Sequence, residues 1–188
     1  LTRSSAASDV YKRQNYDNYL NISDTVIKDK IDSKSKILVV GYSASDDFYI
    51  DCPSYNALKV VKLEKKLIDD LVEVKNLKVF YKAHPDRLKE IEGIFDYSRI
   101  TVVKSKFEEV FSKFDLIIFP TPFSTTFGFC LDTKVKKFLL NTDEINWMKS
   151  DFKYTQKKCS IMKIKLSNSN FSYNKKKLIK NVLKTINN

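Results

Sequence analysis

The sequence predicts an α/β fold, a Rossmann-like parallel sheet of about six strands with helices on both faces. Short apolar runs such as LIIF at Leu116–Phe119 are typical of strands that are buried on both faces of a parallel sheet. Segments with apolar residues at every third or fourth position are typical of amphipathic helices, and they alternate with these runs. The chain has 188 residues, 43% of them hydrophobic, and is long enough to enclose one well-packed core.

Residues 37–91 are expected to form two strands, each followed by a helix. The first strand, Ile37–Val40, ends at Gly41, where the chain must turn sharply. The segment Leu58–Val74 is predicted to be a helix, because its apolar residues recur every three to four positions. Leu77–Tyr81 is the second predicted strand, and a short helix is expected to follow through Ile91.

The same alternation continues to residue 131. Ile100–Val103 is the third predicted strand, and Lys106–Phe114 is predicted to be a helix with its phenylalanines turned inward. The fourth strand, Asp115–Phe119, is stopped by two nearby prolines. The hydroxyl cluster Ser124, Thr125 and Thr126 is well placed to cap a helix through Leu131.

Residues 135–186 complete the predicted domain. Val135–Leu140 is the fifth strand, and a polar loop over residues 141–147 follows it. Ile161–Leu166 is a sixth strand, and Ser172–Ile186 is a terminal helix with an apolar face. Alternating strands and helices favour a parallel sheet covered on both sides.

The first 36 residues are expected to lie outside this domain. Ser4–Gln14, SSAASDVYKRQ, resembles the translation of a transposon-based sequencing adapter, so residues 1–14 are excluded from the fold prediction. Residues 15–36 are polar and are interpreted as a linker from an upstream region. We therefore expect residues 37–188 to be the C-terminal part of a longer protein.

Composition narrows the function classes. The net charge is +11, but the lysines are spread widely and no aromatic motif of an RNA-binding sheet interrupts them, so no specific nucleic-acid partner is expected. Peripheral contact between the basic surface and the inner membrane is kept as an alternative. No run of about 20 apolar residues predicts a membrane-spanning helix, and we expect a cytoplasmic protein. Three cysteines and one histidine lack metal-ligand spacing, so we expect reduced thiols and no metal or cofactor.

The predicted fold locates a ligand site. In the commoner doubly wound strand order, the first and fourth strands are neighbours, and ligands bind beyond their carboxyl ends. The loops there are Gly41–Tyr42–Ser43 and 120–126, with the loop of His84 and Pro85 beside them. Hydroxyls at a helix N-terminus suit a phosphate or carboxylate, although simple capping explains the same residues.

The KAHPDR segment, residues 82–87, offers further candidate donors. Pro85 suits the first turn of a helix and holds His84 extended, and Arg87 carries a fork of donors for an anionic oxygen. Each also has a structural explanation. His84 could be satisfied by a local backbone bond, and Arg87 could be a solvated surface charge.

These residues carry a family resemblance. KAHPDR after one strand and Ser124–Thr125–Thr126 after a later one resemble the paired His-Pro and Ser-Ser/Thr motifs of bacterial GT-B glycosyltransferases that use CMP-sugars. Those enzymes include sialyltransferases, Kdo transferases and capsule polysaccharide transferases. The resemblance covers roughly residues 37–147 and implies half of a GT-B fold, the donor-binding domain. It also implies that His84 contacts the nucleotide phosphate or ribose, that Ser124 and Thr125 contact the phosphate, and that the catalytic base lies in a separate N-terminal domain.

The chain departs from this family at two places. Asp132–Thr133–Lys134 stands where related sequences often have Gly-Lys-Pro, and Phe127 and Phe129 replace small residues after the hydroxyl cluster. The implied function is transfer of a sugar from a nucleotide donor to a saccharide or lipid-linked acceptor. A CDP-polyol phosphotransferase and a non-catalytic nucleotide- or partner-binding module remain as alternatives.

Overall fold

The computed structural model describes residues 34–42, 56–84, 87, 93–96, 98–166 and 170–188. The adapter segment, most of the linker, Ser43, Pro85 and the short helix expected through Ile91 lie outside these residues. The linker was expected to end at residue 36, but the first strand already begins at Ser35. None of the helices in the described ranges is long and apolar enough to cross a membrane.

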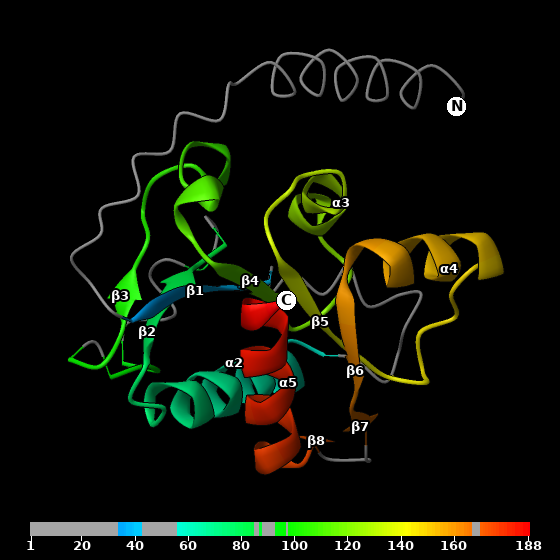
Figure 1. Ribbon diagram of the computed structural model, residues 1–188. Helices are drawn as coiled ribbons and strands as arrows, with labels where there is room; N and C mark the ends of the chain where they lie inside the picture. Colours follow the sequence, from blue (N-terminus) through cyan, green and yellow to red (C-terminus); the bar gives the residue numbers. More distant parts are fainter. Residues whose placement is uncertain (1–33, 43–55, 85–86, 88–92, 97, 167–169) are drawn as a thin grey trace, which may run out of the picture. The chain divides into compact units, whose positions relative to one another are not determined.

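The structure confirms the α/β, Rossmann-like fold. Six parallel strands form one sheet in the order β3-β2-β1-β4-β5-β6 (Figure 1). They are β1 (Ser35–Val40), β2 (Leu77–Lys82), β3 (Thr101–Val102), β4 (Leu116–Phe119), β5 (Lys137–Asn141) and β6 (Ser160–Lys163). A small antiparallel pair, β7 (Lys165–Leu166) and β8 (Phe171–Ser172), follows. Among the described residues the α-helices are α2 (Ala57–Val72), α3 (Thr125–Leu131), α4 (Lys149–Lys158) and α5 (Lys175–Asn187).

Alternate side chains of each strand enter two hydrophobic cores, one on each face of the sheet. In β1, Ile37 and Val39 pack with the buried residues of α2 and α5, whereas Leu38 and Val40 pack with those of α3. Figure 1 shows α2 and α3 on opposite sides of the sheet. Because both faces are covered, the central strands are apolar at nearly every position, as the sequence predicted.

The helix predicted over Lys106–Phe114 is wrong. Two short 3-10 helices, η3 (Phe107–Glu109) and η4 (Phe111–Lys113), occupy the segment. Val110 separates them with φ −127°, well outside the α-helical region. Phenylalanine and valine are weak helix formers, and Phe111 packs edge-to-face against Phe129 of α3 with ring centroids 5.4 Å apart.

The C-terminal third differs in three details. The strand predicted over Ile161–Leu166 divides into β6 and β7, and the N–H of Ile164 donates to the Asn141 carbonyl between them. The terminal helix begins at Lys175, where the Asn174 side chain accepts a hydrogen bond from the Lys177 N–H. Helix α4 was not predicted, because its sequence KSDFKYTQKK has only one buried residue, Thr155, and no apolar stripe.

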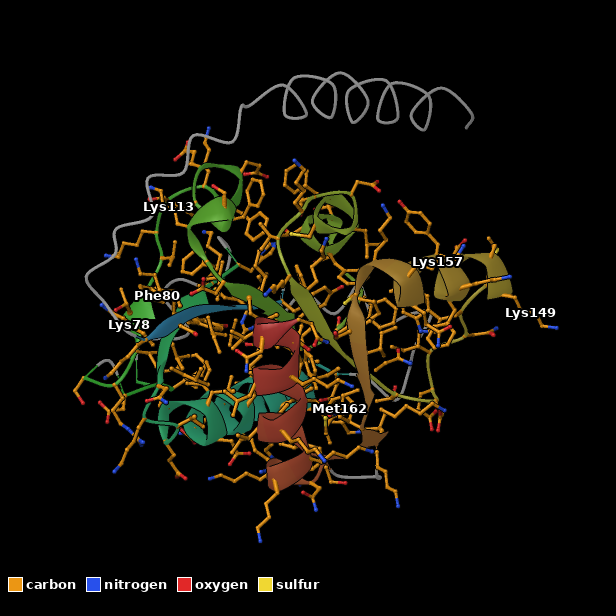
Figure 2. All side chains as sticks on the ribbon, in the orientation of Figure 1. Lys78, Phe80, Lys113, Lys149, Lys157 and Met162 are labelled. Carbon is orange, nitrogen blue, oxygen red and sulfur yellow. The ribbon has the colours of Figure 1, made fainter. Side chains whose placement is uncertain are left out.

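The positive charge is distributed over the domain. Figure 2 shows Lys78, Lys113 and Lys149 on three separate elements, β2, η4 and α4. All three lysines are exposed. This arrangement agrees with a generally basic surface rather than with one concentrated strip.

Candidate active-site crevice at the switch point of the sheet

The strand order places a topological switch point between β1 and β4. From β1 the chain proceeds to β2 and β3 on one side, and from β4 it proceeds to β5 and β6 on the other. In parallel α/β sheets ligands bind in the crevice beyond the carboxyl ends of the two strands at such a point, and here these strands are the neighbours β1 and β4 (Figure 1); we call this position the switch-point crevice. The predicted adjacency of the first and fourth strands is confirmed.

The strand register brings three candidate loops to the same level. Val40 pairs with Lys82, and Val39 pairs with Ile118. Continuing the register of these pairs past the strand ends aligns His84 after β2, Tyr42 after β1 and Thr121 after β4. His84 is half-buried, and Thr121 is buried. The His84 loop and the hydroxyl-bearing loop therefore leave the same edge of the sheet, with the end of β1 between them.

Tyr42 has a structural role that differs from the expected ligand contact. Its ring is only 4% exposed and lies in the core beneath α2. Its backbone N–H donates to Glu64 Oε1 at 2.9 Å, and its carbonyl accepts from the Arg87 guanidinium at 2.6 Å. Both backbone groups are thus used within the protein, and the predicted role of Tyr42 in donor binding is not supported.

Arg87 is likewise part of the interior. Its side chain is 1% exposed, and its guanidinium lies 3.1 Å from Glu64 Oε2. This geometry excludes the solvated surface charge considered for Arg87, and it directs the charge toward a protein carboxylate rather than toward an anionic ligand. Arg87 is also joined to the end of β1, since its guanidinium donates to the Tyr42 carbonyl.

Glu64 of α2 is the centre of this network, and the sequence analysis missed it. Its carboxylate is fully buried and accepts hydrogen bonds from the Tyr81 hydroxyl at 2.7 Å, the Tyr42 N–H and Arg87. Burial raises the pKa of Glu64 above its usual value, and Arg87, Tyr81 and Tyr42 oppose that rise. A signal existed in the sequence, because Glu64 follows Val60 by four residues within the apolar stripe of the predicted helix.

Gly41 is required for a different reason from the one predicted. Among the described glycines only Gly93 has a positive φ, so Gly41 is not needed for a left-handed turn. A Cβ at Gly41 would instead lie 2.2 Å from the Tyr81 hydroxyl oxygen. The absence of a side chain lets the end of β1 pass directly over the tyrosine that binds Glu64.

Ser124 is the N-cap of α3, as predicted. Its backbone is extended, with φ −133° and ψ 143°, and its Oγ accepts from the Phe127 N–H at 3.0 Å. Thr121 makes a similar local bond, because its Oγ1 accepts from the Phe123 N–H at 3.0 Å. Helix α3 has only seven residues, so its dipole is small, and the hydroxyl groups are the stronger candidates for contact with an anion.

Replacing Ser124 with alanine should lower the free energy of unfolding by about 1 kcal/mol, because the Phe127 N–H loses its side-chain acceptor. Thr125→Ala is the matched control. Thr125 is the next residue and is exposed, so its truncation should change stability by less than about 0.5 kcal/mol. Chemical denaturation of both variants measures the difference, and equal losses would argue against a capping role specific to Ser124.

Two cavities lie at opposite ends of the strands. One, of about 490 Å³, is lined by the loops after β4 and β5 and by α3 and α4, next to Ser124. The larger, of about 670 Å³, is lined by Lys136, Lys137 and the start of β6. In the larger cavity Lys137 donates to the Thr133 carbonyl beyond the end of α3, and Lys136 donates to the Ile186 carbonyl of α5. The ammonium groups of both lysines are therefore bound by carbonyl groups near helix ends. Ligands of parallel α/β sheets bind at the carboxyl edge, so the smaller cavity is the better candidate for a ligand site.

The thiols of the two described cysteines are buried. Cys130 and Cys159 are free and buried on the α3 side of the sheet, and burial raises the pKa of each thiol to about 12. Thiols with such pKa values are poor nucleophiles at neutral pH. Within the described ranges no group of three or more His, Cys, Asp or Glu side chains is arranged to hold a metal ion.

Comparison of the chain with protein-family models and with curated proteins gave no match. The function must therefore be argued from the switch-point crevice, the position of His84 and the hydroxyl groups that follow β4.

Proposed function

We propose that this domain binds a nucleotide-sugar donor, specifically a CMP-sugar, and that in its full-length context it transfers the sugar to a saccharide or lipid-linked acceptor. The observation that supports the proposal is the position of the His84 loop and the Thr121–Ser124 loop at one edge of the sheet, on either side of the end of β1 at the switch point. Imidazole and hydroxyl groups are donors that suit a phosphate. The net charge of +11 would also attract an anionic nucleotide.

The chemistry requires stabilisation of a leaving phosphate. Negative charge builds on the phosphate as the bond to the sugar breaks, so pre-oriented donors stabilise the transition state more than the bound substrate. His84, Ser124 and Thr125 are the residues proposed to supply these donors. Arg87 and Tyr42 would act indirectly, by fixing the two loops to Glu64.

Calorimetric titration with CMP, in the presence and absence of a metal chelator, tests the proposal. We expect weak binding that survives the chelator, together with a rise in melting temperature that follows ligand concentration. Tighter binding of CDP-glycerol or CDP-ribitol than of CMP-sugars would favour the phosphotransferase alternative. No heat with any cytidine or uridine nucleotide would refute the proposed function.

Replacing His84 with alanine is expected to weaken CMP binding by about 1.5 to 3 kcal/mol, the range for a hydrogen bond to a charged group. Fold stability should change little, because the side chain is half-buried and the backbone bond from the Arg87 N–H to the His84 carbonyl remains. Calorimetry and chemical denaturation measure the two quantities. A variant that binds CMP normally but unfolds easily would show that the histidine is structural.

His84→Gln is a useful companion variant. Glutamine keeps a hydrogen-bond donor of similar reach, so part of the lost affinity should return if the imidazole acts by hydrogen bonding. If both variants bind equally weakly, the shape or charge of the imidazole matters more than its donor.

A further inference from the structure

The cavity beside Ser124 lies between two loops of the carboxyl edge. Residues 122–124 follow β4, and residues 145–148 follow the neighbouring parallel strand β5. Helices α3 and α4, labelled in Figure 1, supply the remaining walls. The loop after β4 therefore begins at the switch point of the sheet, and its residues Phe123 and Ser124 line the cavity.

The cavity has the size and chemistry of a site for a small planar ring. Its volume of about 490 Å³ falls in the range of about 300 to 1,000 Å³ that is usual for ligand sites. The lining is mainly aromatic and aliphatic, and its few polar side chains include Ser124 and Asp151. Such a mixture favours a ligand with one flat apolar part and one polar part.

Two aromatic walls of the cavity are held in place by buried or cross-element contacts. The indole N–H of Trp147 donates to Asn141 Oδ1 at 2.9 Å, and Asn141 is 3% exposed at the end of β5. The Tyr154 hydroxyl of α4 donates to the Asp132 carboxylate after α3. Because both rings are fixed before a ligand arrives, little ordering of side chains would oppose binding.

The mouth of the cavity carries exposed apolar surface. Met148 is 66% exposed and Tyr154 is 43% exposed, and both line the cavity. Among the described residues, Leu58 on α2 is the remaining large apolar side chain with comparable exposure, at 63%. Two of the three therefore gather at one opening, which is the arrangement expected where a ligand covers them.

We propose that this cavity binds the planar base of the nucleotide, with Trp147, Met148 and Tyr154 as the contacting residues. The inference rests on the proposed function, because it needs a ligand whose phosphate lies near Ser124. Stacking of a base on aromatic side chains is largely independent of the identity of the base, so several bases should be accepted. The loop after β4 would then lie between the base and the crevice that holds the phosphate.

The test compares CMP with ribose 5-phosphate, which lacks the base. The base should make CMP bind about tenfold more tightly to the full chain. Trp147 is the single tryptophan of the chain, so its fluorescence reports on this cavity directly. We expect the emission to change with CMP at the same dissociation constant that calorimetry gives, and to change far less with ribose 5-phosphate.

Substitutions separate the two ligand parts. Met148→Asn should weaken CMP binding several-fold and leave ribose 5-phosphate unaffected, and asparagine is also a favourable N-cap at this first position before α4. Leu58→Asn is the matched control, because it makes the same change at an equally exposed apolar residue on α2, and it should alter neither affinity. Trp147→Leu, measured by calorimetry, should abolish most of the advantage of CMP over ribose 5-phosphate.

Three results are distinguishable. Loss of the base-dependent affinity in Met148→Asn and Trp147→Leu supports the assignment. Normal CMP binding by both variants, without a change in Trp147 emission in the natural sequence, overturns the assignment and leaves the proposed function standing. Absence of binding by any nucleotide overturns both.

Discussion

Replacing Glu64 with glutamine should lower the free energy of unfolding by about 3 to 5 kcal/mol, the usual cost of removing one partner of a buried ion pair. The substitution keeps the shape of the side chain but leaves the Arg87 guanidinium, 1% exposed, without its carboxylate. It also weakens the acceptor for the Tyr81 hydroxyl and the Tyr42 N–H. Urea denaturation of both proteins at neutral pH measures the loss.

Asp69→Asn is the matched control for this prediction. Asp69 lies on the same helix and pairs with Lys65 at 3.0 Å, but both side chains are about half exposed. Solvent screens that pair, so its loss should cost no more than about 1 kcal/mol. Similar losses for Glu64→Gln and Asp69→Asn would contradict the view that burial makes the Glu64 network critical.

A double substitution tests whether the buried charges of Glu64 and Arg87 are needed for stability or for positioning the loops. Buried ion pairs can often be replaced by apolar side chains of similar volume without loss of stability. Glu64→Met combined with Arg87→Met should therefore be more stable than Glu64→Gln alone. If the network exists to position the two loops, the double variant should still bind CMP more weakly than the natural sequence does.

The central strands could be predicted from sequence because their signal is local. Leu116–Phe119 is apolar at all four positions, and it is buried at all four in the structure. Helix α2 shows its stripe equally clearly, with Val60, Leu63 and Leu71 buried. In these elements, the pattern and the tertiary environment agree.

The network under the crevice could not be predicted in the same way. Glu64 and Arg87 are 23 residues apart, and their pairing depends on how α2 lies against the end of β2. A lone arginine is usually a surface charge, so local sequence favours the wrong environment for Arg87. The same holds for Tyr42, because the packing of α2, and not the local sequence, places its ring in the core rather than against a ligand.

For the loop after β4, the sequence predicts the helix cap but not the cavity next to it. The cap at Ser124 follows from residue type and spacing, and the hydrogen bond to the Phe127 N–H is present. The cavity next to it could not be predicted, because it needs α4, a helix with no apolar stripe, and the indole of Trp147 anchored on Asn141. A site formed by several weakly patterned segments has no local signature.

Gly41→Ala is expected to destabilise the domain by about 3 kcal/mol, at the upper end of the cost of overpacking. The new Cβ would lie 2.2 Å from Tyr81 Oη and 2.7 Å from its Cζ, and real Cβ atoms do not approach that closely. The ring cannot move aside easily, because Tyr81 is fully buried, contacts Phe95 with ring centroids 4.7 Å apart, and donates to Glu64. A shift of the ring would therefore also disturb the Glu64 network.

Combining Gly41→Ala with Tyr81→Phe tests this cause. Removing the hydroxyl takes away the nearest atom, although Cζ at 2.7 Å remains, so the clash is relieved in part. Tyr81→Phe alone should cost about 1 to 3 kcal/mol, because Glu64 loses one donor. The double variant should then lose less than the sum of the two single losses in chemical denaturation. Strict additivity would mean that the two residues do not interact, and that Gly41 is required at this position for a reason other than the tyrosine beneath it.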